Sequence, residues 1–237
     1  MLNYNITADM LTENGTDTCI LPIGSVEQHG PHLPIGTDVI LANAFAERIG
    51  EKIGCLVLPA LPFSTCYEHR GKKGSVWMKP ETLYRVIEDL VICLKSQGFK
   101  KIIVLISHGG VFIAAPVIRE LNACNTDITV VKLDLVEIYF SPEVKRFQEC
   151  SNNLHACEIE TSLMLYLNEG LVRKDKIVDF IPDIPRGYLN YASIFAFCPE
   201  GVWGKPSLAT QQKGEQLFKT VVDLSVEYIV TVFRKLK

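Results

Sequence analysis

Residues 101–110 read KIIVLISHGG, an apolar run that ends in a polar, glycine-rich turn. A continuous apolar run of this length is typical of a β-strand that is covered on both faces, as in a parallel sheet. The turn places His108 directly after the strand, and open parallel sheets bind ligands at the C-terminal ends of their strands. The sequence therefore predicts a buried strand that is followed by a functional loop.

Strand-like and helical patterns alternate through the rest of the chain. Further strands are predicted at residues 18–23, 55–58 and 128–133. Helices are predicted at residues 40–53, 80–97, 112–123, 158–167 and 208–236. Strands separated by helices indicate an α/β fold with a mostly parallel sheet and helices on both sides. We expect one domain over residues 1–237, in which the proline- and glycine-rich stretch 181–206 is a structured loop region over the site.

The composition is that of an ordinary globular protein, with 48% hydrophobic residues, 22% charged residues and a formal net charge of −3. Nucleic-acid-binding proteins are usually basic, so this charge argues against that class. No apolar run approaches the roughly 20 residues of a membrane span, and the N-terminal stretch has neither the basic start nor the apolar centre of a secretory signal. We therefore expect a cytoplasmic protein whose eight scattered cysteines remain free thiols.

The densest polar chemistry follows the first predicted strand, in the segment GSVEQHGPHLPIGTD at residues 24–38. Glu27 and His29 are two positions apart, and on an extended backbone such residues point to the same side. The glycines and prolines that follow turn the chain, so that Asp38 returns to this pair. In the alternative interpretation Asp38 only caps the next helix, which leaves Glu27 and His29 without a role. We predict that all three side chains bind a divalent metal.

His108 is the next predicted metal ligand, and the paired glycines Gly109 and Gly110 allow the backbone to approach a substrate closely. A third segment, HACEIETS, covers residues 155–162. If its helix has begun by His155, His155 and Glu158 share one face, whereas Glu158 and Glu160 lie roughly 200° apart. We expect Glu158 to be the metal ligand, whereas Glu160 either supports the ligands from outside the metal site or is a first-turn acid favoured by the helix dipole. The alternative is the exposed start of an amphipathic helix.

Glu68 and His69 follow another predicted strand, and we expect them to face the substrate. Cys66, together with His69, raises the alternative of a thiol nucleophile, although neither an activating base nor an oxyanion hole is identifiable. The metal interpretation balances in charge, because three carboxylates and two neutral imidazoles supply −3 and two divalent ions supply +4, which leaves room for a hydroxide. Mixed histidine and carboxylate ligands suit Zn²⁺ or Mn²⁺, and a carboxylate such as Asp38 is able to bridge two ions roughly 3.5–4 Å apart.

These segments resemble the motifs of the creatininase family, which comprises creatinine amidohydrolase and its relatives. GSVEQHGPHLPIGTD closely resembles the family signature, and SHGG resembles its Asn-Gly-His-Gly-Gly-Asn segment. HACEIETS resembles a His-Ala-Gly-Glu-x-Glu-Thr-Ser segment, and GVWGKPSLAT with Gly214 resembles a late Gly-Val-x-Gly-x-Pro motif. The resemblance implies a three-layer α/β/α sandwich, two metal ions per subunit, hydrolysis of a C–N bond in a small amide, and a homo-oligomer that is frequently a hexamer.

The resemblance also implies roles for single residues. Carried over by position, Glu27, Asp38 and His108 hold one ion, and His29, Asp38 and an acid hold the other. In creatininase proper that acid lies where this chain has Gly110, and members with glycine there have an acid that matches Glu158. The catalytic histidine of the family matches His155, and we expect Glu160 to act with it in catalysis by orienting His155 or a water. The chain departs from the family motifs at Ser107, Val111 and Cys157, and it has no obvious counterparts of the tryptophans that close over creatinine, which argues against creatinine as the substrate.

From the sequence we therefore expect a metal-dependent hydrolase that cleaves an amide, cyclic amide or formamide with a metal-activated water. One alternative is a formamide deformylase of flavin or deazaflavin metabolism, which would recognise a phosphate with basic residues such as Arg70, Lys72 and Lys73. The other alternative is a non-catalytic relative that binds a metal or ligand in a closed, saturated site.

Overall fold

The centre of the molecule is a parallel sheet of four strands in the order β2-β1-β3-β4, in a computed structural model that describes residues 2–236. The strands are β1 (Thr18–Ile23), β2 (Leu56–Val57), β3 (Lys101–Ile106) and β4 (Thr129–Asp134). Every pairing is parallel, and Ile106 at the end of β3 is in register with both Ile23 of β1 and Asp134 of β4. The three longer strands therefore end at the same edge of the sheet.

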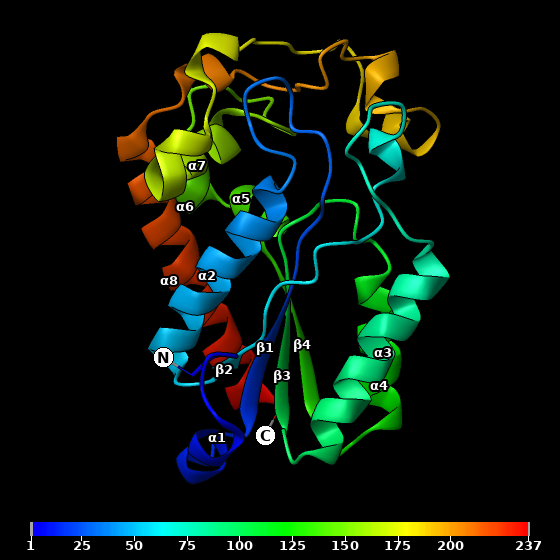
Figure 1. Ribbon diagram of the computed structural model, residues 1–237, viewed down its shortest axis with the longest axis vertical. Helices are drawn as coiled ribbons and strands as arrows, with labels where there is room; N and C mark the ends of the chain where they lie inside the picture. Colours follow the sequence, from blue (N-terminus) through cyan, green and yellow to red (C-terminus); the bar gives the residue numbers. More distant parts are fainter. Residues whose placement is uncertain (1, 237) are drawn as a thin grey trace.

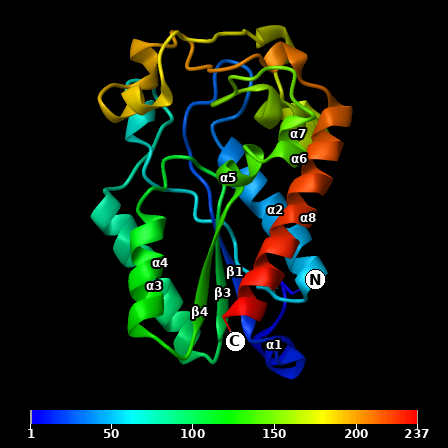
Figure 2. The same ribbon diagram turned by 180° about the vertical axis from the view of Figure 1, so that it is seen from behind.

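Helices cover both faces of the sheet, which confirms the predicted α/β sandwich (Figure 1). One face carries α2 (Thr37–Ile53), α7 (Glu158–Asn168) and α8 (Gln211–Lys235), and the other carries α3 (Pro80–Ser96) and α4 (Ala114–Cys124). The view from behind shows the same two layers, with α8 running along the sheet beside α2 (Figure 2). The sequence patterns missed three short helices: α1 (Ala8–Asn14), α5 (Leu135–Tyr139) and α6 (Pro142–Lys145).

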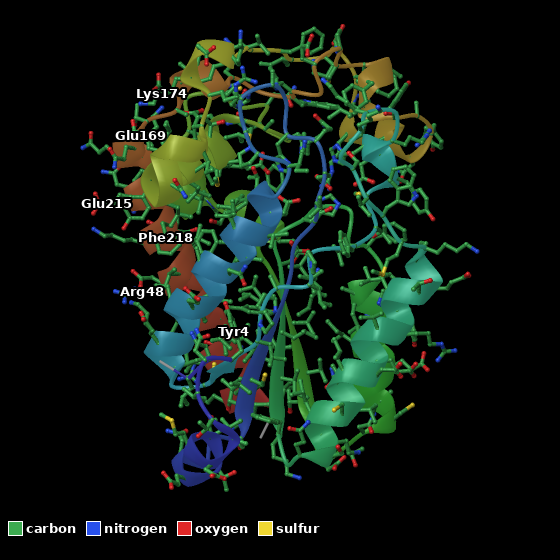
Figure 3. All side chains as sticks on the ribbon, in the orientation of Figure 1. Tyr4, Arg48, Glu169, Lys174, Glu215 and Phe218 are labelled. Carbon is green, nitrogen blue, oxygen red and sulfur yellow. The ribbon has the colours of Figure 1, made fainter. Side chains whose placement is uncertain are left out.

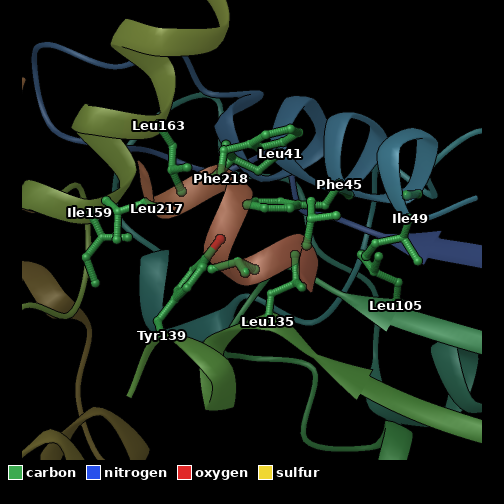
Figure 4. Close-up of a cluster of buried hydrophobic side chains, with 14 of the residues drawn as sticks. Leu41, Phe45, Ile49, Leu105, Leu135, Tyr139, Ile159, Leu163, Leu217 and Phe218 are labelled. Atoms are coloured by element: carbon green, nitrogen blue, oxygen red, sulfur yellow. The ribbon is translucent and has the colours of Figure 1, made fainter. Parts of the chain in front are cut away.

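Apolar side chains of each strand alternate between two separate cores. Ile103 and Leu105 of β3 pack toward α2 and α8, whereas Ile102 and Val104 pack toward α3 and α4. Successive side chains of a strand point to opposite faces, so a strand with a core on each side needs apolar residues at every position. Figure 4 shows the first core, where the Phe45 ring lies beside Phe218, with ring centroids 4.8 Å apart.

The surface of the helical layer is polar. Figure 3 shows Arg48 of α2, Glu215 of α8, and Glu169 and Lys174 of the short turns after α7 on the outside of this layer, with Phe218 between α2 and α8. None of the helices between residues 2 and 236 combines the length and apolar character that crossing a membrane requires.

All eight cysteines lie within the described residues and all are free, as predicted. Six of them are buried and behave as small apolar side chains. Cys93 and Cys124 are exposed, because they lie on the outer faces of α3 and α4, away from the sheet.

The loops that carry the predicted site residues gather above the C-terminal ends of β1, β3 and β4 (Figure 1). Residues 181–206 cross over this region and contain two short 3₁₀ helices, Arg186–Asn190 and Ile194–Ala196. Three residues of this stretch line the cavity at the strand ends: Arg186, Leu189 and Ile194. The prediction of a structured loop region over the site is therefore confirmed.

Helices α7 and α8 pack in direct backbone contact at Gly214, and this contact gives a test of the fold. A Cβ atom on residue 214 would lie 1.9 Å from the carbonyl oxygen of Ser162. Alanine normally stabilises a helix relative to glycine, but here Gly214→Ala should lower the free energy of unfolding by about 1–3 kcal/mol because the backbones must separate. Gly170→Ala, whose Cβ would have only an ordinary contact 3.6 Å from Asn168, is the control for urea denaturation. A stabilised Gly214→Ala variant would contradict the packing.

Candidate metal centre

Buried acids and histidines from four parts of the chain converge at the strand ends. Glu27 and His29 follow β1, Asp38 lies in the first turn of α2, His108 follows β3, and Glu160 lies in the first turn of α7. None of these five side chains is more than 9% exposed. Three overlapping groups each bring their potential ligand atoms within 4.8 Å of one another: Glu27, Asp38 and His108; His29, Asp38 and Glu160; and Glu27, His29 and His155.

In the first group the ring of His108 presents Nδ1 to two carboxylates. Nδ1 lies 3.2 Å from Glu27 Oε2 and 3.2 Å from Asp38 Oδ2. The other ring nitrogen, Nε2, is 3.0 Å from the carbonyl oxygen of Thr65 and donates to it. A carbonyl oxygen accepts only, so the proton is on Nε2 and the lone pair of Nδ1 is free for a cation.

In the second group His29 is oriented in the same way. Its Nδ1 donates to the carbonyl oxygen of Glu27 at 3.1 Å, and its Nε2 lies 3.3 Å from Asp38 Oδ1. Asp38 therefore directs one oxygen toward His29 and the other toward His108. A carboxylate between two ligand groups is the arrangement that bridges a pair of metal ions.

Two local contacts bring Asp38 to this position. A Cβ atom on Gly24 would lie 2.7 Å from the backbone of Val39, so only glycine allows the end of β1 to approach the first turn of α2 this closely. Ser107 Oγ donates to the carbonyl oxygen of Asp38 at 2.7 Å and ties the same turn to the end of β3. Asp38 is therefore held against both central strands.

Several buried polar atoms of this cluster lack a hydrogen-bond partner among the described residues. They are both carboxylate oxygens of Glu27, Nε2 of His29 and Oδ2 of Asp38. Leaving such atoms unpaired in the interior is costly, so buried charges are usually paired or bound to a metal. The unpaired atoms are acceptors and they face one another, which is the donor set that a divalent cation requires. The residues therefore fit a metal.

The pKa shifts of the buried acids and of His29 also indicate a site that attracts positive charge. Burial raises the pKa of Glu27, and burial raises the pKa of Glu160 to about 7. Burial alone would lower the pKa of His29, but the Asp38 carboxylate outweighs it and raises the pKa of His29 to about 9. Excess negative charge in a dry site thus attracts positive charge, which a proton or a metal ion supplies.

His155 and His69 lie beside the acids and are oriented by Gln28. His155 Nε2 donates to the Gln28 carbonyl oxygen at 2.7 Å, which leaves Nδ1 unprotonated and 3.8 Å from Glu27 Oε1. The Gln28 side-chain nitrogen donates to His69 Nδ1 at 2.9 Å, so His69 carries its proton on Nε2, 3.1 Å from the same oxygen. Sequence reasoning missed Gln28, although its place between Glu27 and His29 was a signal.

The structure places Glu158 away from the metal group, contrary to the sequence-based expectation. Helix α7 begins at Glu158, and His155 lies outside it in a bridge to Trp203, so the argument from a shared helical face does not apply. The Glu158 carboxylate accepts from the backbone N–H groups of Glu149 and Cys150 at 3.1 and 2.9 Å and pairs with Lys213 at 2.6 Å. Glu160, on the opposite side of the helix, faces His29 and Asp38.

The expected substrate-facing residues line a cavity of about 60 Å³ next to the acids. Glu68, His69, Gly109 and Gly110 are all in its wall. Gly110 leaves no room for a side chain, because a Cβ atom there would lie 2.3 Å from Glu68 Oε1 and 2.4 Å from His108 Nε2.

The same cavity contains a tyrosine that sequence reasoning missed. Tyr139 lines it, and its hydroxyl has no hydrogen-bond partner among the described residues. Burial, followed by the carboxylates of Glu160 and Asp38, raises the pKa of this hydroxyl well above its ordinary range, so it stays a proton donor.

The thiol alternative is disfavoured by the surroundings of Cys66. Burial raises the pKa of the Cys66 thiol to about 12, and the His69 nitrogen that would act as its base already accepts from Gln28. The thiolate is the reactive form of cysteine, so a thiol in this state is a poor nucleophile.

Residues 5–229 match the family described as creatinine amidohydrolase, that is, creatininase. The chain belongs to the creatininase family. Among curated proteins it is 27% identical to 3-dehydro-scyllo-inosose hydrolase of Thermotoga maritima, over 87% of this chain and 75% of that protein. It is 29% identical to creatinine amidohydrolase of Pseudomonas putida, over 88% and 86% of the two chains. These creatininase-family relatives are hydrolases by name.

The fold is also that of solved creatininases. A structure named as creatininase with Mn has a TM-score of 0.86 at 24% identity and covers 98% of each chain. A Zn-Zn form of a mutant creatininase has a TM-score of 0.84 at 24% identity, again over 98% of each chain. Two solved structures of this fold are therefore named for Mn and for Zn.

Two isosteric changes in the first turn of α7, two residues apart, test the ligand assignment. Glu160→Gln should reduce the metal content of the protein after dialysis, because it removes one charged ligand from the group with His29 and Asp38. Glu158→Gln should retain the metal and lower the free energy of unfolding by about 1–3 kcal/mol, since it weakens a charge-assisted network with Lys213. Metal analysis by mass spectrometry measures the metal content of both variants, and urea denaturation measures the stability of Glu158→Gln. If Glu160→Gln kept its metal and Glu158→Gln lost it, the ligand assignment would be reversed.

Proposed function

We propose that the protein is a hydrolase of C–N bonds in small amides and that it works with two divalent ions, Zn²⁺ or Mn²⁺. The observation that carries the proposal is the pair of ligand groups that share Asp38: Glu27 and His108 on one side, His29 and Glu160 on the other. The mixed histidine and carboxylate donors suit these metals. When bound, such ions lower the pKa of a water ligand toward about 7 and polarise a carbonyl group.

Within this proposal His155 transfers the proton. Its Nδ1 has a free lone pair and faces the acids, because Nε2 is fixed to the Gln28 carbonyl oxygen. His155 therefore accepts the proton of the attacking water at Nδ1 and gives it to the leaving nitrogen, so that the amine departs neutral. The two other histidines of the cavity wall beside Glu27 have different roles here: His108 is assigned to the metal, and His69 carries a proton on the nitrogen that faces Glu27.

Tyr139 is the donor that the proposal assigns to the substrate oxygen. Its hydroxyl is buried without a partner among the described residues, in the cavity wall and close enough to Glu160 and Asp38 to sense their charges. When the carbonyl carbon becomes tetrahedral, its oxygen gains negative charge, and a pre-positioned O–H donor stabilises that charge.

The non-catalytic alternative is the weaker interpretation, because the cavity beside the acids is lined by a free base and a free donor in addition to the ligand groups. A purely structural metal site would be closed by four protein ligands. The relative from Thermotoga maritima is named 3-dehydro-scyllo-inosose hydrolase. The substrate panel should therefore include an inosose in addition to cyclic amides, formamides and short peptides.

Removal of metal provides the first test. Dialysis against a chelator should abolish hydrolysis of every active member of the panel, and Zn²⁺ or Mn²⁺ should restore it, because the water is activated only in their presence. The control is circular dichroism of the stripped protein, which separates loss of metal from loss of the fold. Full activity in a sample shown by mass spectrometry to be metal-free would contradict the proposal.

Variants of the cavity wall provide the second test. His155→Asn should lower kcat by about 10²–10⁴-fold with the metal content unchanged, because it removes the proton carrier. Tyr139→Phe should lower kcat by about 10–100-fold while leaving the protein as stable as before or more stable, since an unpaired buried hydroxyl is removed. Unchanged kcat in both variants would show that neither side chain takes part.

A further inference from the structure

A second hollow, here called the outer chamber, opens beside the metal centre and shares part of its wall. Glu68, Gly109, Gly110, Arg186 and Leu189 line both the outer chamber and the inner cavity. The outer chamber is completed by residues that include Arg70, Tyr67 and Phe112. A ligand that occupies both spaces therefore contacts this shared wall, which includes Glu68 and Arg186.

The inner cavity and the outer chamber differ in volume, so they hold different parts of a substrate. The inner cavity has a volume of about 60 Å³ and the outer chamber about 500 Å³. Pockets that enclose a small-molecule ligand usually have roughly 300–1,000 Å³. The inner cavity therefore has room only for the reacting group, and the remainder of a substrate lies in the outer chamber.

The outer chamber carries two arginines whose guanidinium groups are largely free. Arg186 Nη2 donates to the Gly109 carbonyl oxygen at 3.2 Å, and Arg70 Nη1 donates to the Tyr67 carbonyl oxygen at 3.0 Å. A guanidinium has five N–H donors, so most of each group remains available. The one acidic side chain of the chamber, Glu68, lies 3.5 Å from His108 Nε2 and thus leans toward the metal centre.

The position of Arg186 at this boundary depends on glycine at residue 109. A Cβ atom there would lie 2.8 Å from Arg186 Nη2, closer than packing allows. Glycine at 109 therefore lets the guanidinium reach the mouth of the inner cavity. Lys72, by contrast, lies 3.6 Å from Glu200 and over the Phe195 ring, and neither Lys72 nor Lys73 lines the chamber.

We propose that the outer chamber binds an anionic group of the substrate, a carboxylate or a phosphate, through Arg186 and Arg70. The inference rests on the proposed hydrolase function and names its substrate class: an amide with a negative charge remote from the bond that is cleaved. The planar guanidinium forks match the oxygens of such groups, and the Tyr67 and Phe112 rings provide an apolar wall for the carbon chain between the charge and the amide.

The ordinary alternative is that Arg186 only anchors residues 181–206 to Gly109. Loss of an anchor would disturb the cavity for every substrate alike. Loss of an anion-binding group would weaken only substrates that carry the charge. A comparison of charged and neutral substrates in the same variant therefore separates the two.

The experiment uses metal-loaded protein and sets of amides that differ only at the far end, which carries a carboxylate, a phosphate or a neutral carboxamide. Arg186→Gln and Arg70→Gln should each lower kcat/KM for charged members by about 10–100-fold, mainly through KM, and change the neutral member less than about twofold. Lys73→Gln removes a nearby charge outside the chamber and should change neither. Equal losses for charged and neutral members overturn the inference, and the carboxylate and phosphate arms identify the group preferred.

A binding measurement keeps this inference separable from the hydrolase proposal. If no amide is cleaved, succinate and inorganic phosphate are titrated into the same four metal-loaded proteins by calorimetry. Weaker binding to Arg186→Gln and Arg70→Gln than to the wild type and Lys73→Gln would support the anion site although the hydrolase proposal had failed. Equal binding to all four proteins, or no binding to the wild type, would overturn it.

Discussion

The carboxylate of Asp38 lies between two imidazoles from distant parts of the chain, 3.3 Å from His29 and 3.2 Å from His108. All three side chains are buried, and the carboxylates of Glu27 and Glu160 lie beside them in the interior. Buried charges of one sign must be neutralised by protons or by bound metal ions, so the geometry of this cluster restricts everything around it. Three features position Asp38 between the two histidines. They are the parallel register of β1 and β3, the close approach at Gly24 and the hydrogen bond from Ser107.

A layer of hydrogen bonds around the acids decides which nitrogen of each histidine is free. Carbonyl oxygens of Thr65, Glu27 and Gln28 accept from His108, His29 and His155 respectively. Each bond fixes the proton on one nitrogen and leaves the other with a lone pair that faces the cluster. The backbone of the signature segment thus sets the protonation of its histidines besides positioning its side chains, since two of these three carbonyls belong to residues 27 and 28.

The metal group and the surroundings of the substrate are separate parts of the structure. The acids and histidines come from strand ends and helix starts, which the sheet holds in place, whereas Arg70, Arg186 and Leu189 come from loops. Loops tolerate sequence change better than the elements that they connect. This separation accounts for a family whose named relatives act on substrates as different as creatinine and 3-dehydro-scyllo-inosose.

The parallel sheet, the positions of the longer helices and the segments that supply the buried acids and histidines could be predicted from the sequence, because apolar periodicity and residue spacing are local properties. It did not reveal α1, α5 and α6, which are too short for a clear period. The sequence did not show that Glu160, and not Glu158, lies beside His29 and Asp38, because this depends on where α7 begins and on the contact of Glu158 with Lys213, 55 residues further along the chain. The hydrogen bond from Arg186 to Gly109 joins residues that are 77 positions apart. A local sequence pattern does not predict this contact, because it forms only when the chain folds.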